Sequence, residues 1–578
     1  MIAFIPRLLV AYAIGMTWDE ASYVLSGGLA LRNLVSLNFS REAWSFEFHP
    51  PVLMYLYAIS YVIWVLIDAL LRYGLSTDFS LLYVNVLNMA SGQSALVAMR
   101  FPAVTLGALS CVIVYLFSYN LVPSKKMALL SGLALAFSPL FTAQTSLAVL
   151  DGSVAFFYVC AIWLFYRAAR FGSVKDLVIS SICAGLAFGS SETGFGILLI
   201  LGGWVSVLLV RKDEQGTLPG LNSKSKWHLL IWLVLALAVF YVAWPWLWGD
   251  PIGQFLKNVR LFTTGHVRGG WKDFFLLPFD YYVVLFFVTT PVTLLILYGV
   301  GIIGSVSCSE LRREILLLLL WVTIPTIVLG LPFVVRVGVR TITFIVPSLS
   351  ILTGIGIFRL NSLIATMKTK EICYRACCRA LRKTLIFIFV VLALCLLVVE
   401  NAKIHPYYLD YYNQLVGGTN GAKDTFLVGW WGEGMDKAIE FIDTHAKANS
   451  TVWIYGPKSV ALYHSTRVDL NKTLAGEPLF HARAEWGMPQ QVDKSILTVR
   501  RGDLTFYFPY YYPERHQQLD SDYVRALGVQ YVLVYRFYTY PGILDSVNYN
   551  FVTALMNSKQ AAYTVAIHNV VVCWVYEI

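Results

Sequence analysis

Two short stretches near the N-terminus carry residues that could do acid–base chemistry. Adjacent carboxylates, Asp19 and Glu20, directly follow an apolar run, and His49 precedes two prolines just before another apolar run. A charged side chain at the centre of a bilayer costs roughly 3 kcal/mol or more, so acids beside apolar runs either face water or belong to a site. Asp19 could instead cap a helix, because Asp is a favourable N-cap residue and an acid suits a helix N-terminus. These residues alone leave both roles open.

The composition indicates in which class of protein these residues lie. The chain has 578 residues, of which 57% are hydrophobic and only 13% are charged. Its first two-thirds is a succession of apolar runs near the ~20 residues that cross a bilayer, so we expect a polytopic α-helical membrane protein. The net charge is +10, but the basic residues cluster in short loops between apolar runs. Such clusters orient a membrane protein, and we therefore expect no nucleic-acid partner.

The loop charges also predict the topology. The run 52–67 is treated as a helix in the outer interface, within one external loop from residue 17 to residue 100, because every strongly basic loop then falls on the cytoplasmic side. About eleven spans result, with the N-terminus inside the cell. They cover 1–16, a short run broken by Pro6 and Arg7, then 101–121, 127–147, 152–166, 177–190, 194–210, 227–246, 279–303, 315–335, 341–358 and 384–400.

This topology gathers charged residues from distant parts of the chain on the outer side of the membrane. They are Asp19, Glu20, His49, Asp151, Glu192, Arg336 and Arg340. Each has a structural alternative, since Asp151-Gly152 fits a simple turn and the two arginines could reach lipid headgroups. Together, they favour an active site embedded at the outer face of the membrane.

The composition changes from Asn401 onward. Glycine and aromatic clusters appear, together with strand-like runs at 451–455, 531–535 and 570–576 and a helical pattern at 435–446. We therefore expect a membrane domain at 1–400 and an extracytoplasmic α/β domain at 401–578. Cys573 is the one cysteine of that second domain, so no disulfide can form within it.

The order of these motifs resembles the protein O-mannosyltransferase and aminoarabinose-transferase superfamily. The residues that carry the resemblance are Asp19-Glu20, His49-Pro50-Pro51, Asp151, the tryptophan-rich loop 244–248, Arg336 with Arg340, the segment 411–418 and the sequence WGEG at 431–434. The superfamily consists of glycosyltransferases of the GT-C fold that use polyprenyl-phosphate sugars. The resemblance is mainly to prokaryotic, especially archaeal, members with a C-terminal outer domain.

The resemblance implies a dolichyl-phosphate-hexose type of donor, mannose-like, and inversion at the anomeric carbon. The acid that matches the family's general base is Asp19, and Glu20 beside it is expected to orient either Asp19 or a loop amide. Asp151 is a second carboxylate, which could orient the acceptor or Asp19, or hold a divalent cation. No other cofactor is expected.

The resemblance also indicates where the donor phosphate binds. Many relatives carry a lysine in the turn after the fifth span, but this chain has the sequence GSSETG at 189–194. Phosphate binding must then depend on other residues. The candidates are Arg340, Arg336, His49, Arg100 and Lys272.

The acceptor stays open, since a protein hydroxyl, a lipid or a growing glycan would all fit the outer face. An oligosaccharyltransferase-like enzyme is an alternative, because Trp430-Trp431-Gly432-Glu433-Gly434 lies where those enzymes carry Trp-Trp-Asp-Tyr-Gly, but the aspartate and tyrosine are absent. A transporter would show internal repeats and spans broken near the middle of the membrane, and neither is evident. A structural surface protein would not need converging acids and arginines.

Overall fold

The computed structural model covers all 578 residues and gives a described conformation to most of them. The residues that it leaves undescribed are 41–42, 45–48, 74–91, 211–225, 261–279, 332–333, 335–337, 367–371, 466–495, 502, 510–523, 525, 527, 541–542 and 545.

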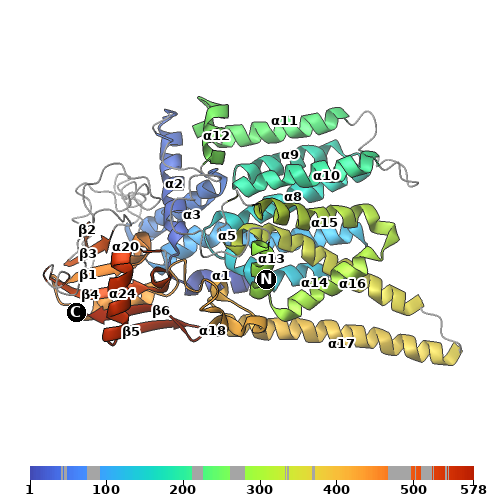
Figure 1. The fold of residues 1–578 in the computed structure, drawn as a ribbon. Coiled ribbons are helices and arrows are strands. Elements are labelled where there is room, and N and C mark those ends of the chain that lie inside the picture. Colours follow the sequence, from blue (N-terminus) through green and yellow to red (C-terminus); the bar gives the residue numbers. More distant parts are fainter. Residues whose placement is uncertain are drawn as a thin grey trace.

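The larger part of the molecule is a bundle of α-helices (Figure 1). Its first half consists of α1 (Phe4–Ala13), α2 (Trp18–Val35), α3 (Val52–Tyr73), α5 (Gln93–Leu121), α6 (Lys125–Ala136), α7 (Pro139–Gln144), α8 (Leu150–Phe171), α9 (Val174–Phe188), the 3₁₀ turn η2 (Glu192–Phe195) and α10 (Gly196–Val210). The second half consists of α11 (Lys226–Ala243), η5 (Pro245–Leu247), α12 (Pro251–Arg260), α13 (Tyr281–Thr289), α14 (Val292–Val306), η8 (Ser309–Leu311), α15 (Arg312–Leu329), η9 (Val339–Ile345), α16 (Val346–Thr366) and α17 (Ile372–Ile404).

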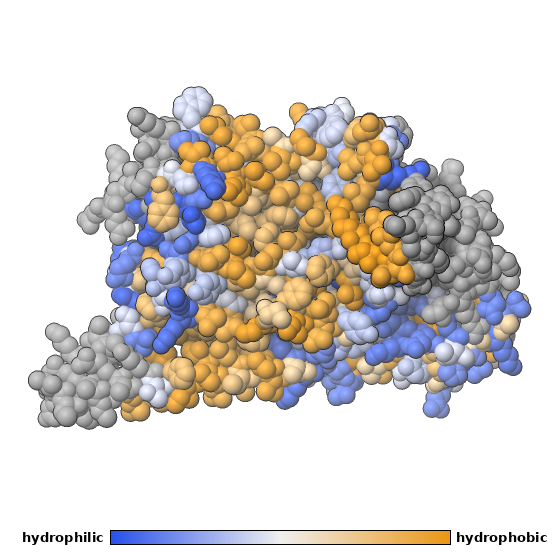
Figure 2. Space-filling view, turned by 180° about the vertical axis from the view of Figure 1, so that it is seen from behind, coloured by the Kyte–Doolittle hydropathy of each residue, from blue (hydrophilic) through white to orange (hydrophobic). Residues whose placement is uncertain are grey.

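The bundle fits a polytopic membrane protein. Six of its described helices are long and apolar enough to cross a bilayer, and a bent pair, α13 with α14, makes a seventh candidate. A broad hydrophobic band covers the middle of the molecule, with hydrophilic surface at either end (Figure 2). Because α3 is itself long and apolar enough to span, the interfacial placement of 52–67 and the count of eleven spans both stay predictions.

Two runs that the sequence predicts as single helices are broken. Residues 127–147 form α6 and α7, because Ser138 caps the new helix and Pro139 occupies its first turn. Proline cannot donate the hydrogen bond that a continuous helix needs there. Residues 279–303 bend by 118° between α13 and α14, at Thr290-Pro291.

The C-terminal part contains a six-stranded mixed sheet at one end of the bundle (Figure 1). Its strands are β1 (Thr451–Tyr455), β2 (Ile496–Arg501), β3 (Leu504–Pro509), β4 (Val529–Tyr535), β5 (Tyr563–Ile567) and β6 (Val570–Glu577), in the order β2-β3-β1-β4-β6-β5. Shorter elements accompany it, namely η10 (Tyr408–Asp410), η11 (Gln414–Val416), α18 (Gly418–Ala422), α19 (Met435–His445), α20 (Lys458–His464), η12 (Arg536–Thr539) and α24 (Ser546–Ser558).

The sequence pattern explains the sheet. The central strand β1 pairs in parallel with β3 and β4 and is buried along almost its whole length, as expected of a parallel strand covered on both faces. Helix α19 is amphipathic and buries Met435, Ala438, Ile439 and Ile442, at the spacing of one helix face. The strands and the helix predicted for this region are thus confirmed, whereas its extracytoplasmic location stays a prediction.

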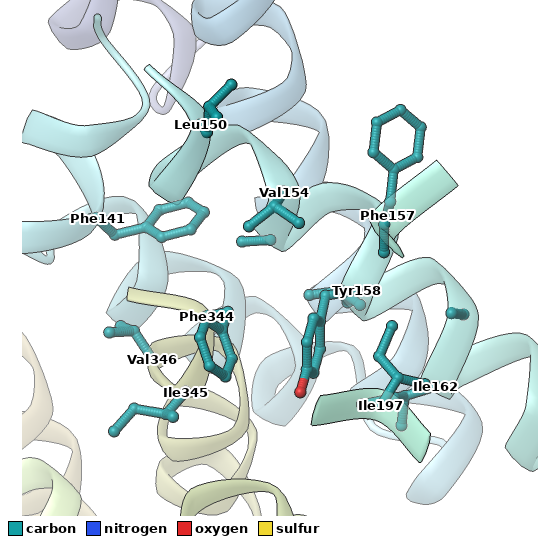
Figure 3. Packing of buried hydrophobic residues seen from close by; sticks show 14 of the residues in the cluster. Phe141, Leu150, Val154, Phe157, Tyr158, Ile162, Ile197, Phe344, Ile345 and Val346 are labelled. Carbon is teal, nitrogen blue, oxygen red and sulfur yellow. The ribbon is translucent and has the colours of Figure 1, made fainter. Parts of the chain in front are cut away.

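The packing between α7, α8 and η9 positions the site. In Figure 3, the Tyr158 ring of α8 lies beside the Phe344 ring of η9, and the two centroids are 4.7 Å apart in a stacked arrangement. Phe141 and Val154 are fully buried in the same core. This core joins the start of α8, which carries Asp151, to η9, which carries Arg340.

Candidate active site

The centre of the site is an ion pair between Asp19 and Arg340. Arg340 Nη1 donates to Asp19 Oδ2 at 2.5 Å, and Arg340 Nε lies 3.4 Å from Asp151 Oδ2. One guanidinium therefore bridges a carboxylate of α2 and a carboxylate of α8. Asp19 is 4% exposed and Arg340 is 8% exposed. Such shielding from water strengthens the electrostatic interaction between these groups.

The N-cap residue of α2 is Thr17, and Glu20 completes a capping box with it. Glu20 Oε2 accepts hydrogen bonds from the backbone N–H and the hydroxyl of Thr17, both at 2.9 Å. The N-cap role that the sequence leaves open for Asp19 thus belongs to Thr17. Asp19 in the first turn of α2 is left to face Arg340.

Glu20 is also the partner of Arg100, and both side chains are fully buried. The guanidinium donates twice to Glu20, at 2.7 Å each, and to the carbonyls of Ala11, Ile14 and Gly15. These five bonds use the whole donor capacity of an arginine. We therefore withdraw Arg100 as a candidate for phosphate binding, because no donor is left for a ligand and no surface is open to one.

The same bonds change the interpretation of Glu20. Besides Thr17 and Arg100, its Oε1 accepts from the backbone N–H of Ala148 at 2.8 Å. Glu20 thereby ties α2 to α5 and to the segment that leads into α8. Its position is that of a structural acid that fixes the start of α2 beside the start of α8, and not that of a group which meets substrate.

Asp151 lies in the first turn of α8, next to a glycine that the packing requires. A Cβ atom at Gly152 would lie 2.1 Å from the carbonyl oxygen of Gln144. The same turn is held by Tyr57, whose hydroxyl donates to the carbonyl of Val149 at 2.6 Å. The close approach of α7 and α8 is thus what brings Asp151 within reach of Arg340.

His49 lies beside the centre and faces another acid. Its Nδ1 is 3.2 Å from Glu192 Oε2, and Asn258 Nδ2 donates to Glu192 Oε1 at 3.3 Å. Tyr23 packs edge-on against the imidazole, with centroids 5.8 Å apart. This polar group joins the segment before α3 to η2 and α12. His49 stays in the candidate site because it lies beside the centre formed by Asp19 and Arg340. Its partner, however, is the carboxylate of Glu192. The other two phosphate-binding candidates, Arg336 and Lys272, lie outside the described residues.

Two tryptophans that the sequence assigns no role complete the centre. The Arg340 guanidinium lies 4.5 Å from the ring centroid of Trp431 and 5.2 Å from that of Trp430, a cation–π arrangement. Trp431 Nε1 also donates to Asp19 Oδ2 at 3.1 Å. The sequence signals were the WGEG motif at 431–434 and the likeness of 430–434 to Trp-Trp-Asp-Tyr-Gly, and neither indicated what these tryptophans contact.

A partly open pocket with a cavity volume of about 100 Å³ lies beside Arg340. Asp19 is not among its lining residues. Its walls are mostly apolar and aromatic and include Gln144, Tyr281, Arg340, Tyr411, Tyr412 and Trp430. An arginine in an otherwise apolar pocket suits a ligand with an anionic group and an apolar body.

No group of three or more His, Cys, Asp or Glu side chains able to hold a metal ion occurs within the described parts of the chain. Asp151 faces an arginine instead, so its role as a cation ligand stays a prediction.

Part of the chain is similar in sequence to a known protein family. Residues 79–246 match the family model described as dolichyl-phosphate-mannose-protein mannosyltransferase. Dolichyl-phosphate-mannose–protein mannosyltransferase 1 of Saccharomyces cerevisiae is 23% identical over 244 residues, which is 40% of this chain. The match spans 27% of the yeast protein, about a quarter of its length.

The fold has a match over nearly its whole length. The crystal structure of ArnT from Cupriavidus metallidurans, bound to undecaprenyl phosphate, aligns with a TM-score of 0.52 and 14% identity over 99% of this chain and 96% of that chain. An oligosaccharyltransferase from Archaeoglobus fulgidus in the apo form aligns with a TM-score of 0.45 and 14% identity over 92% of this chain and 69% of that chain.

The two kinds of likeness cover different amounts of the chain. The sequence likeness is confined to part of the chain, whereas the likeness of fold to ArnT extends over nearly all of it. The chain is thus similar over residues 79–246 to the dolichyl-phosphate-mannose-protein mannosyltransferases, and its fold is similar to that of ArnT.

Proposed function

We propose that this protein transfers a single hexose, mannose-like, from a polyprenyl-phosphate donor to an acceptor hydroxyl at the outer face of the membrane, with inversion. The observation that carries the proposal is the bridge of Arg340 between Asp19 and Asp151. It offers a fixed cation for the phosphate leaving group and carboxylates for the acceptor within one shielded centre.

In the proposed reaction, Asp19 removes the proton of the acceptor hydroxyl. The acceptor oxygen forms a bond to the anomeric carbon as the bond from that carbon to the phosphate oxygen breaks. The leaving polyprenyl phosphate keeps the electron pair, and its added negative charge is stabilised by Arg340. A positioned general base contributes about 10²- to 10⁴-fold to the rate, and a fixed cation in a water-poor site stabilises the charge that develops.

The ion pair determines the order of the steps in this reaction. Without donor, the guanidinium of Arg340 is shared between Asp19 and Asp151. A donor phosphate competes with both carboxylates for it. Phosphate binding therefore releases Asp19, which becomes a proton acceptor when the sugar is in place. Asp151 then orients the acceptor or Asp19.

The pocket supports the choice of donor. Its aromatic walls suit the apolar body of an isoprenoid phosphate or the face of a sugar ring, and Arg340 is one of its lining residues. The likeness to the yeast mannosyltransferase and to ArnT supports the same donor class. An acceptor hydroxyl on a protein, a lipid or a glycan is compatible with this site.

The test uses the purified protein in detergent or nanodiscs with a panel of polyprenyl-phosphate sugars. We expect release of polyprenyl phosphate with a mannose-like donor, and release at least about 10²-fold slower with the Asp19→Asn variant under the same conditions. Turnover of a lipid-linked oligosaccharide but of no monosaccharide donor would refute the proposal in favour of an oligosaccharyltransferase. Analysis of the product anomer checks inversion.

A further inference from the structure

Trp431 contacts both Asp19 and the residue before it. Its carbonyl oxygen accepts a hydrogen bond from the backbone N–H of Trp18 at 2.8 Å, and its indole N–H donates to Asp19 Oδ2 at 3.1 Å. One contact fixes where α2 begins and the other fixes where the carboxylate points. A residue 412 positions away in sequence thus determines both the place and the orientation of Asp19.

Trp431 is itself held by Glu433. Glu433 Oε2 accepts from the backbone N–H of Trp431 at 3.0 Å and from the hydroxyl of Tyr535 at 2.9 Å. That hydroxyl in turn accepts from the backbone N–H of Gly432 at 2.8 Å. Tyr535 is fully buried at the end of β4. The segment 429–434, which we name the tryptophan loop, is therefore anchored to the central part of the sheet.

The backbone conformation of the tryptophan loop requires glycine at positions 432 and 434. Gly432 has φ +98° and Gly434 has φ +81°, in a region that other residues rarely adopt. A Cβ at Gly432 would also lie 3.0 Å from a side-chain carbon of Val460. The loop start is fixed as well, since the backbone N–H of Gly429 donates to Asp410 Oδ1 at 2.7 Å. The conformation that presents Trp431 to Asp19 is thus specified along the whole loop.

We propose that Trp431 is a positioning residue for Asp19 and Arg340, and that Glu433 and Tyr535 act through it by holding the tryptophan loop. The inference rests on the proposed function, in which Asp19 is the base. It also gives the C-terminal sheet a role in the reaction, since the strand that ends at Tyr535 supports the catalytic carboxylate.

The acids of the loop make this support sensitive to pH. Burial and the nearby Asp410 raise the pKa of Glu433 to about 8, and burial raises the pKa of Asp410 to about 6. Neither Glu433 Oε1 nor Asp410 Oδ2 accepts a hydrogen bond from any residue that the structure describes. Asp410 is already charged at pH 8, so as the pH rises through about 8 Glu433 becomes a second buried charge near it. The loop that they anchor should then loosen.

The other groups around this pair do not cancel that effect. Arg536, after β4, is the cation that acts on Asp410, while Cys573 of β6 lies near Glu433 and near Asp436 of α19. Burial raises the pKa of the Cys573 thiol and of the Tyr535 hydroxyl well above their usual values. Neither therefore ionises between pH 7 and pH 9, so Glu433 is the group expected to titrate in that range.

The test compares Trp431→Phe, Glu433→Gln and Tyr535→Phe with the control Glu440→Gln, whose side chain is exposed on α19. Trp431→Phe keeps an aromatic ring near Arg340 and the backbone carbonyl but removes the indole donor. We expect kcat to fall about 10-fold or more while the KM for donor changes less, because a misplaced catalytic group costs about 10²-fold. Tyr535→Phe should lower kcat in the same direction, and Glu440→Gln should leave it unchanged.

The pH profile separates positioning from a general loss of structure. Wild type and Glu440→Gln should lose kcat between pH 7 and pH 9, whereas Glu433→Gln, which cannot ionise, should lose less. Wild-type kcat in Trp431→Phe, or a Glu433→Gln profile that follows wild type, would overturn the inference.

A double-mutant cycle between Trp431→Phe and Asp19→Asn, read as the free energy of unfolding, does not depend on identifying the donor. Contacting residues couple by about 0.5–3 kcal/mol, and strict additivity would also overturn the inference. If no sugar donor is turned over by wild type, the proposed function fails, and this cycle alone decides whether Trp431 positions Asp19.

Discussion

Arg340 and Asp19 lie 321 positions apart in the sequence, yet Nη1 of the one donates to Oδ2 of the other at 2.5 Å. The same guanidinium reaches Asp151 and lies over the ring of Trp431. An arginine paired in this way is already oriented, so a phosphate that binds it gains a cation without first having to order a mobile side chain. Under the proposed function, the pair is therefore both the resting state of the site and the group that receives the donor phosphate.

Asp19→Asn tests the base. We expect turnover to fall by about 10²-fold or more, because the amide cannot accept the proton. Donor affinity should be unchanged or higher, since Arg340 loses a carboxylate that competes with the phosphate. The measurements are initial rates and donor binding by titration calorimetry, with the exposed Asp424→Asn as control. Near-wild-type turnover would mean that another group removes the proton.

Arg340→Ala tests the phosphate site. Loss of one partner of a desolvated charge pair costs about 3 to 5 kcal/mol, so donor binding should be lost at ordinary concentrations. Arg340→Lys should restore it only in part, because an ammonium cannot reproduce the planar fork that reaches both acids. Lys403→Ala, at an exposed position, serves as control. Unchanged donor affinity in Arg340→Ala would place the phosphate elsewhere.

The variant Arg100→Met tests whether Arg100 stabilises the fold or binds the donor phosphate. The variant leaves Glu20 buried without its cation, which should lower the free energy of unfolding by about 3 to 5 kcal/mol. The thermal midpoint of unfolding should fall, while the donor affinity of the protein that remains folded stays at the wild-type value. The reverse result, a normal midpoint with weakened donor binding, would restore Arg100 to the phosphate site that the sequence predicted.

Protonation of His464 is expected to lower the stability of the protein in acid. Its Nε2 accepts a hydrogen bond from the backbone N–H of Met16 at 2.9 Å, and burial lowers its pKa to about 4. The unfolded chain has a histidine pKa near 6.5, so this contribution is complete above pH ~6.5 and is lost as the pH falls toward 4. The ring is partly exposed, so we expect the loss to be about 2 kcal/mol or less.

Thermal unfolding between pH 7 and pH 4 checks this prediction. His464→Gln should flatten the acid side of the stability profile, whereas His445→Gln, at an exposed histidine of α19, should not. Identical profiles for wild type and His464→Gln would show that the neutral imidazole does not stabilise the linker between α1 and α2.

The sequence was sufficient for the features that depend on composition and local order. Apolar runs with basic loops indicated a polytopic membrane protein, because each run must satisfy its own backbone in lipid. Three strands of the C-terminal sheet, β1, β4 and β6, followed from their local patterns, whereas β2, β3 and β5 were not predicted. Asp19, Asp151 and Arg340 could be grouped because all three adjoin the same predicted side of the bundle, and the structure brings them together.

The sequence could not assign partners to the charges. Asp19 and Glu20 are neighbours of similar chemistry, but successive residues of a helix point about 100° apart. One carboxylate therefore meets Arg340 and the other meets Arg100, in opposite roles. Likewise, Trp431 acquires its role only where β4 supports the loop and α2 begins beside it. Which residue holds which depends on how distant elements pack, and that packing is a property of the folded chain as a whole.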